Sequence, residues 1–294
     1  MKRFRLILGI LIAVTTISIA YSTMSIRGSA PKPGAGIAPE SAVAPLSQSP
    51  TLEITYIANE GVLISSGDKQ VLIDGLHREY QPDYAFLPAA EREKIETAKA
   101  PFDKIDLVLV SHMHLDHFHP ESVGLHLKHN PKAMLVSSQQ VVEEVAQKFK
   151  DYEAIKARVT GATPLWKEKV AMKVAGIDFE ILGLRHGTGR WRSLQNLGHI
   201  IKLGGKKLLH VGDADTEVEN FEKLNLDEEG IDIAILPSWF LFGDGLTIVR
   251  EHIKPKQIIA VHISPSEAKK TAREIKQAFP NAVAFTTMLE KRSY

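Results

Sequence analysis

Cysteine is absent from this chain of 294 residues. Its absence excludes disulfides, a thiolate nucleophile and thiolate metal ligands, so any metal ion must be held by histidine, aspartate or glutamate. An excess of charge of one sign is missing as well, because 36 lysines and arginines balance 35 aspartates and glutamates. We therefore expect no nucleic-acid partner. What is present, 44% hydrophobic and 24% charged residues, is typical of a globular domain.

The first 27 residues have the features of an export signal. Three basic residues among the first five precede an uncharged stretch over residues 6–20, which ends in a Ser-Ile-Ala triplet. This order is typical of a secretory signal peptide, and an uncleaved membrane anchor over residues 6–24 is the alternative. The basic residues stay on the cytoplasmic side in both cases, which predicts an exported, periplasmic or otherwise extracytoplasmic protein. The anchor would also associate the protein with the membrane.

Residues 28–50 contain five prolines among glycine, alanine and serine, which predicts an extended linker. Residues 51–294 then form one folded domain. Apolar β-like runs alternate there with helical patterns, as in the strand Leu107–Val110 and the helix Glu121–His129, and a strand at Ala282–Phe285 closes the chain. This alternation predicts an α/β fold with sheets inside and helices outside.

Histidines gather directly after the predicted strand Leu107–Val110. Of the 12 histidines, four lie between His112 and His119, and Asp116 and His117 are adjacent. A loop at a strand end can aim such side chains at one point, and imidazole with carboxylate suits zinc, manganese or iron. A surface loop that binds metal only adventitiously is the alternative, but its place at a strand end argues against it.

The run from His112 to His117 resembles the His-x-His-x-Asp-His signature of the metallo-β-lactamase superfamily, whose fold is a four-layer αβ/βα sandwich. The other parts of the superfamily pattern follow in order over about residues 52–285. Asp74 follows Leu72-Ile73, His186 follows a strand that ends at Leu184, Asp213 follows Gly212, and His262 follows Val261.

The resemblance implies a role for each of these residues. One metal ion would be held by three histidines, a second ion by one aspartate and two histidines, and a further aspartate would bridge them: His112, His114 and His186; Asp116, His117 and His262; Asp213. Asp74 would support the ligand loop from behind. In such hydrolases the ions lie about 3.5–4 Å apart and share a hydroxide that acts as the nucleophile. Asp116 would have a secondary catalytic role as a proton acceptor for incoming water. The ions are expected to be Zn²⁺, with Mn²⁺ or iron as alternatives.

Three of these assignments have competitors in the sequence. His199 competes with His186 as the third histidine of the first ion, Asp215 competes with Asp213, and capping of a turn is the less favoured alternative for Asp74. The remaining histidines are interpreted as surface or packing residues: His77, His119, His126, His129, His210 and His252.

At two positions the sequence differs from other branches of the superfamily, and these differences argue against two kinds of activity. Standard class B β-lactamases carry cysteine where this chain has Asp213, so antibiotic hydrolysis is not expected. Diiron oxidoreductases of the superfamily carry a carboxylate where His114 stands, which argues against redox chemistry. The segments 232–237, 253–256 and 261–262 resemble the branch that contains ascorbate-6-phosphate lactonase and the phospholipase D acting on N-acyl-phosphatidylethanolamine.

These patterns predict an exported metal-dependent hydrolase that cleaves a phosphodiester, ester or lactone in a small-molecule or lipid-like substrate. Arg190 and Arg192 follow His186 and are candidates to bind an anionic substrate, since guanidinium matches phosphate oxygens. Trp239 is a candidate pocket wall. A solvated loop and simple packing are the alternatives for these three residues. The alternative function is a non-catalytic metal-binding scaffold or sensor with the same fold.

Overall fold

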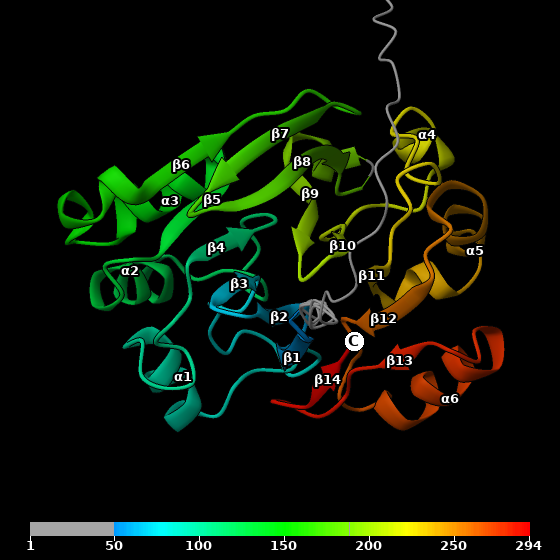
Figure 1. Ribbon diagram of the computed structural model, residues 1–294, viewed down its shortest axis with the longest axis horizontal. Coiled ribbons are helices and arrows are strands. Elements are labelled where there is room, and N and C mark those ends of the chain that lie inside the picture. The colour runs from blue at the N-terminus through cyan, green and yellow to red at the C-terminus, as the bar shows by residue number, and fades with distance from the viewer. Residues whose placement is uncertain (1–49, 188) are drawn as a thin grey trace, which may run out of the picture. The chain divides into compact units, whose positions relative to one another are not determined.

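Two seven-stranded sheets lie face to face in the part of the chain that a computed structural model describes, residues 50–187 and 189–294 (Figure 1). The predicted signal segment and, apart from Pro50, the predicted linker lie outside these residues. Within them, no helix is both long and apolar enough to cross a membrane.

The first sheet has the spatial order β14-β1-β2-β3-β4-β5-β6. Its strands are antiparallel from β14 to β3 and parallel from β3 to β6. The strands are β1 Leu52–Ala58, β2 Gly61–Ser66, β3 Lys69–Ile73, β4 Leu107–Val110, β5 Met134–Ser138, β6 Val159–Ala162 and β14 Lys291–Ser293.

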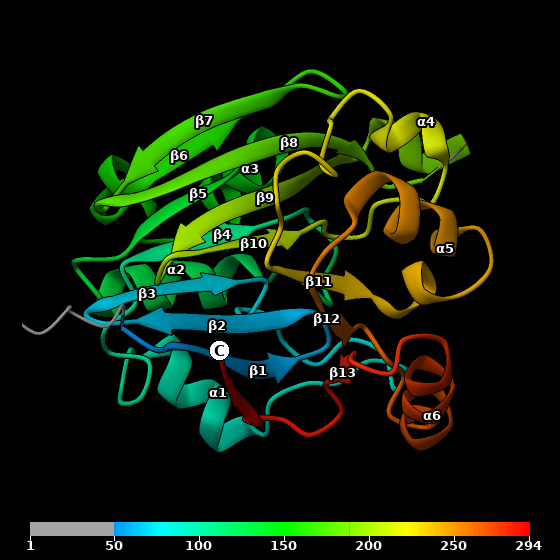
Figure 2. The same cartoon turned by 45° about the vertical axis from the view of Figure 1, so that its right-hand side comes forward.

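The second sheet has the order β13-β12-β11-β10-β9-β8-β7, and Figure 2 shows β9 to β12 side by side. It is antiparallel from β7 to β10 and parallel from β10 to β13. The strands are β7 Lys169–Val174, β8 Ile177–Arg185, β9 Gln195–Leu203, β10 Lys206–His210, β11 Ile233–Pro237, β12 Gln257–Val261 and β13 Val283–Ala284.

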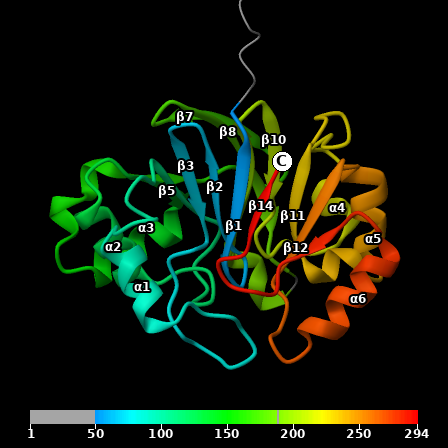
Figure 3. The same ribbon diagram turned by 60° about the horizontal axis from the view of Figure 1, so that its bottom comes forward.

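Helices cover the outer face of each sheet (Figure 3). On the first sheet these are α1 Ala89–Glu96, α2 Pro120–His129 and α3 Gln139–Lys148, and on the second α4 Val218–Phe221, α5 Gly245–Thr247, the π-helical turn η5 Ile248–Ile253 and α6 Ala268–Ala278. Short 3₁₀ turns complete the described elements: η1 Tyr152–Ala154, η2 Lys156–Arg158, η3 Gly189–Ser193 and η4 Ser238–Leu241.

The apolar run of β4 explains why the sheets end up inside. Leu107 and Leu109 pack into the core between the two sheets, whereas Val108 and Val110 pack under the helices of the first sheet. Successive side chains of a strand point to opposite faces, so a strand that is apolar throughout needs cover on both sides. The predicted α/β class and the four-layer αβ/βα arrangement are confirmed.

The C-terminal region differs from the sequence-based expectation. Beyond β13, which lies within the predicted strand Ala282–Phe285, the chain returns to the first sheet and pairs Lys291–Ser293 with β1. This last strand is short, polar and exposed, so it has none of the apolar alternation that identifies strands in a sequence.

Candidate metal centre

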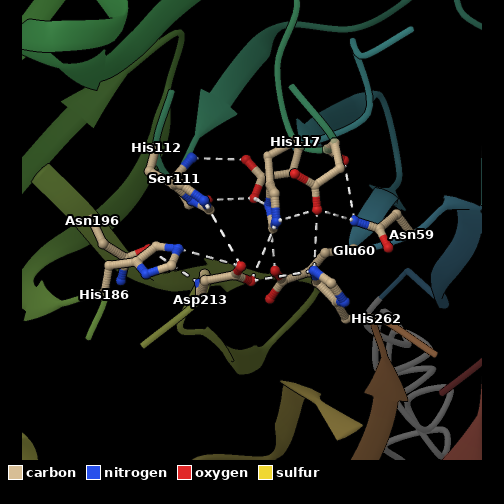
Figure 4. Close-up of polar contacts among 12 residues, drawn as sticks. Asn59, Glu60, Ser111, His112, His117, His186, Asn196, Asp213 and His262 are labelled. Atoms are coloured by element: carbon tan, nitrogen blue, oxygen red, sulfur yellow. Dashed lines mark hydrogen bonds and ion pairs between the residues drawn. The ribbon is translucent and has the colours of Figure 1, made fainter. Parts of the chain in front are cut away.

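The loops that follow β4, β8, β10 and β12 carry all seven predicted ligands: His112, His114, Asp116, His117, His186, Asp213 and His262. β4 belongs to the first sheet and the other three strands run in one direction in the second. In α/β proteins, sites form outside the carboxyl ends of such strands. Figure 4 shows how His112, His117, His186, Asp213 and His262 converge.

The first ligand group consists of His112, His114 and His186 with Asp213. The three imidazole rings approach one another with centroid distances of 4.7, 4.8 and 4.6 Å. Oδ2 of Asp213 lies 3.4 Å from Nε2 of His186 and 3.9 Å from Nε2 of His112. Each residue offers a ligand atom, and these atoms all lie within 4.8 Å of one another.

The second ligand group consists of Asp116, His117 and His262, again with Asp213. Oδ2 of Asp116 lies 3.3 Å from Nε2 of His117 and 3.2 Å from Nε2 of His262. Oδ1 of Asp213 lies 3.3 and 3.6 Å from the same two nitrogens. Asp213 therefore directs one carboxylate oxygen to each group, as a bridging ligand does.

The atoms of both groups fit divalent metal ions. The buried Nε2 atoms of His112, His117 and His262, both ring nitrogens of His186, and Oδ1 of Asp213 have no hydrogen-bond partner among the described residues. Buried polar atoms normally have partners, so such a concentration points to a missing one. Imidazole nitrogen and carboxylate oxygen are ligands of zinc and of neighbouring first-row metals.

Protonation differs between the groups in the metal-free protein. Burial lowers the pKa of His112 well below its usual value, which leaves a neutral imidazole. Burial also acts to lower the pKa of His117, but the carboxylates of Asp213 and Asp116 outweigh it and hold that pKa well above the usual value. In the same way, His117 and His262 outweigh burial and keep the pKa of Asp213 well below its ordinary range. A protonated His117 thus supplies the positive charge that the carboxylates require when no metal is bound.

Asp74 lies behind the ligand loop and orients it. Its Oδ1 accepts the backbone N–H of Ser111 at 2.7 Å, and its Oδ2 accepts the Ser111 hydroxyl at 2.5 Å. Oδ2 also lies 2.9 Å from Nδ1 of His117, which directs Nε2 of that ring toward the second ligand group. A carboxylate behind a histidine ligand fixes both its tautomer and its orientation. Turn capping is therefore not what this side chain does.

The sequence-based interpretation missed two residues, Asn59 and Glu60, in the turn between β1 and β2. Nδ2 of Asn59 donates to Oδ2 of Asp116 at 3.0 Å. Glu60 is fully buried, with Oε2 3.3 Å from Nδ1 of His117 and Oε1 3.5 Å from Nε2 of His210. Burial raises the pKa of Glu60 well above its usual value. Both residues follow a predicted strand, as His186 and His262 do, and that position is the one signal in the sequence that points to them.

A left-handed residue precedes the bridging aspartate. Gly212 has a φ of +55°, and a Cβ there would lie 2.4 Å from Oδ1 of Asn196. That same oxygen accepts the backbone N–H of Asp213 at 3.1 Å, while Nδ2 of Asn196 donates to Val211. Glycine therefore permits both the backbone turn and the close approach that place Asp213 between the two groups.

The geometry separates the competing candidates. His199 is buried on β9 and belongs to neither ligand group, with its ring centroid 6.2 Å from that of His210. Oδ1 of Asp215 instead accepts hydrogen bonds from Nδ2 of Asn220 and the backbone N–H of Glu217. The structure thus places His186 and Asp213, and not these competitors, in the ligand groups. Of the other histidines, His77, His126 and His210 are buried, and Nε2 of His210 lies 3.5 Å from Oε1 of Glu60.

A cavity of about 460 Å³ opens over the ligand groups. It is lined by His114, Asp116, His186 and Asp213 together with Tyr80, Gln81, Tyr84, Met113, Leu115, Arg190 and Trp191. The three residues predicted to bind substrate lie at three different positions. Arg190 lines this cavity, Arg192 lines a separate cavity of about 280 Å³ beside Arg185 and Trp166, and the Trp239 ring lies 5.0 Å from that of His262.

Comparison with known proteins assigns the chain to a family. The β-lactamase superfamily domain matches residues 70–283. The chain belongs to the metallo-β-lactamase superfamily. This superfamily member is 27% identical over 221 residues to a "UPF0173 metal-dependent hydrolase" of Pelotomaculum thermopropionicum, with 72% of this chain and 84% of the relative covered. It is 26% identical over 240 residues to a protein of the same description from Pyrococcus furiosus, with 76% and 93% covered.

Solved structures agree with the superfamily fold. A metallo hydrolase from the archaeon Ignicoccus hospitalis superposes with a TM-score of 0.56 at 17% sequence identity, covering 83% of this chain and 98% of that one. At this identity the likeness concerns the fold alone. The two ligand groups therefore rest on the geometry of this metallo-β-lactamase superfamily member itself.

Proposed function

We propose that the protein is a hydrolase that uses two divalent metal ions, Zn²⁺ in the first instance, to cleave a phosphodiester, ester or lactone. One observation carries the proposal: the two carboxylate oxygens of Asp213 face two separate groups of ligand atoms. The names of the curated relatives, metal-dependent hydrolases, support the same reaction type.

The ligands would divide as the two groups do. His112, His114 and His186 would hold one ion, Asp116, His117 and His262 the other, and Asp213 both. When bound, a pair of such ions lowers the pKa of water to about 7 and polarises the substrate oxygen.

Other side chains prepare this reaction. Asp74 and Glu60 orient His117 from behind, and Asn59 holds the Asp116 carboxylate. Asp116 lines the cavity, where it is placed to accept a proton from incoming water. Arg190 lines the same cavity and would bind an anionic oxygen of the substrate, because guanidinium donates hydrogen bonds in a planar fork. Trp239 would act as a wall beside His262.

The proposal extends to the setting of the enzyme. We place it near the branch of ascorbate-6-phosphate lactonase and N-acyl-phosphatidylethanolamine phospholipase D, on the motifs in segments 232–237, 253–256 and 261–262. The basic start and uncharged stretch of residues 1–27 support export to an extracytoplasmic compartment, either as a cleaved protein or anchored by residues 6–24. Small-molecule and lipid-like substrates both suit that location.

The test combines metal analysis with a substrate panel. Protein purified after expression with zinc and manganese should contain close to two metal equivalents. It should also hydrolyse at least one of three probes: bis(4-nitrophenyl) phosphate, 4-nitrophenyl acetate and γ-butyrolactone. A protein without metal would overturn the site, whereas two metal equivalents without any turnover would favour the non-catalytic scaffold or sensor.

A further inference from the structure

Large hydrophobic side chains are exposed at six positions of the described chain: Tyr80, Leu115, Leu165, Trp191, Val218 and Met288. Three of the six line the single cavity over the candidate metal centre, where Tyr80 is 48%, Leu115 40% and Trp191 37% exposed. Scattered exposed hydrophobics need no explanation, but a cluster at a cavity marks a ligand-binding surface. We call these three residues the apolar collar.

The collar surrounds both ligand groups. On one side, the Trp191 ring lies 5.0 Å from that of His114 and 5.6 Å from that of His186, beside the first group. On the other side, Tyr80 stacks at 6.3 Å on Tyr84, whose ring meets His262 of the second group edge-on at 5.4 Å. In the sequence, Leu115 lies between His114 of the first group and Asp116 of the second. The three side chains line the same cavity as the ligands His114, Asp116, His186 and Asp213.

Packing does not account for the exposed area of the collar. Tyr80 and Trp191 each leave over a third of their residue surface in solvent, although aromatic side chains gain most when fully buried. The cavity also offers few charges for a ligand. Asp116 and Asp213 are candidate metal ligands, which leaves Arg190 as the one other charged side chain that the described residues contribute to its lining. The guanidinium of Arg190 itself lies over the Trp191 ring at 4.3 Å.

We propose that the substrate carries an apolar group of about the size of a phenyl ring next to the bond that is cleaved, and that the collar binds this group. The inference rests on the proposed function for the position of the cleaved bond, but the collar itself can be tested by binding alone. Methylphosphonate and phenylphosphonate are suitable probes because they present the same anionic group to metal ions and Arg190 and differ only in the apolar substituent.

The experiment measures the affinity of the zinc-loaded protein for both phosphonates by isothermal titration calorimetry. We expect phenylphosphonate to bind about tenfold more tightly, since a phenyl ring removes far more apolar surface from water than a methyl group. Tyr80→Ala and Leu115→Ala should each reduce this ratio several-fold at unchanged metal content. Leu165→Ala is the matched control, because Leu165 is 75% exposed and does not line the cavity, and it should leave the ratio as in the wild type.

Turnover provides a second comparison. Bis(4-nitrophenyl) phosphate and methyl 4-nitrophenyl phosphate release the same leaving group, as do 4-nitrophenyl phenylacetate and 4-nitrophenyl acetate. The collar variants should lower kcat/KM for the aromatic member of the hydrolysed pair more than for the methyl member, mainly through KM. For each substrate, kcat/KM of the variant is divided by kcat/KM of the wild type, which cancels differences in the intrinsic reactivity of the substrates.

The outcomes separate the two proposals. Equal affinity for the two phosphonates, or a ratio that neither collar variant reduces, overturns the collar even if the protein is an active hydrolase. A ratio that falls as expected in a protein with two metal equivalents and no turnover upholds the collar as a ligand-binding surface and overturns the hydrolase.

Discussion

The first ligand group presents three imidazoles and one carboxylate, whereas the second presents two of each. Behind the first group, His112 contacts the Ser111 hydroxyl at 2.9 Å, and His114 is only half-buried beside the cavity. Behind the second, His117 is fully buried against Asp74 and Glu60. Negative charge is therefore concentrated on one half of the centre. We infer that the second group binds its ion more tightly and that the first group is closer to the substrate.

The largest effect should come from the residue that the two halves share. Asp213→Asn removes a charge from both groups at once, so both ions should be lost and kcat/KM should fall about a thousandfold. Metal analysis and turnover of the best probe measure this. Asp215→Asn is the matched control and should retain two metal equivalents, because Oδ1 of Asp215 accepts its bonds from Asn220 and Glu217 outside the centre. Equal loss in both variants would contradict the bridge.

Removal of one histidine from each ligand group tests the difference in metal affinity between the two groups directly. His114→Ala and His117→Ala should each retain about one metal equivalent and lose about a hundredfold in kcat/KM. The ion that remains in His114→Ala lies in the second group, and it should withstand about a tenfold higher chelator concentration than the ion in His117→Ala, because more carboxylate charge surrounds it. The reverse order in a competition titration would show that the charge behind His117 does not strengthen metal binding.

The buried carboxylates test the same difference without removing a ligand. Asp74→Asn and Glu60→Gln keep the shape of each side chain. The first removes a charge next to Nδ1 of His117, and the second replaces a carboxyl group whose pKa burial raises well above its usual value. Loss of such a partner typically weakens metal binding by about ten- to a hundredfold. Only the tighter of the two stepwise dissociation constants, which we assign to the second group, should change, so the first group is the internal control. Asp74→Asn should have the larger effect, since its 2.9 Å contact is the shorter one.

His126 is buried outside both ligand groups, so it tests how the free energy of unfolding depends on pH independently of the metal centre. Nδ1 of His126 donates to the Ile95 carbonyl at 2.6 Å, and burial lowers the pKa of His126 to about 4. The pKa of this histidine is about 6.5 in the unfolded chain. Below that pH the unfolded chain therefore binds a proton that His126 does not bind in the folded chain until the pH reaches about 4. The free energy of unfolding should therefore fall by about 2 kcal/mol between pH 7 and pH 5 from this residue alone.

The measurement is urea unfolding at both pH values for the wild type and His126→Asn, whose amide can still donate to Ile95. The variant should lose less stability than the wild type on acidification by about that amount. Absolute stabilities need not match, because the comparison concerns the change with pH. Parallel losses in the two proteins would show that His126 is protonated in the folded state.

Much of this centre could be predicted because its residues follow strands. The run Leu107–Val110 is a strand at its predicted bounds, and the helix Glu121–His129 begins one residue earlier, at Pro120. Residues after such strands meet at one edge. The resemblance to the metallo-β-lactamase superfamily pattern selected the seven residues, and the fold brings them together.

The contributions that escaped prediction depend on tertiary packing. Glu60 follows a predicted strand, but glutamate is a common surface residue type, and its burial against His117 depends on how the β1–β2 turn folds back on the ligand loop. Arg190 and Arg192 are two residues apart, yet η3 directs them to different cavities. Side-chain direction in a short irregular turn has no periodicity in the sequence from which it could be inferred.

The pairing of β14 with β1 has a consequence for synthesis on the ribosome. Residues 291–293 complete the sheet edge next to residues 53–55, with Nζ of Lys291 bonded to a carboxylate 238 positions earlier in the chain. One edge of β1 therefore stays without its partner until nearly all of the described chain has been translated, and contacts of such long range form slowly. The first sheet can therefore gain its last strand only after β14 has left the ribosome.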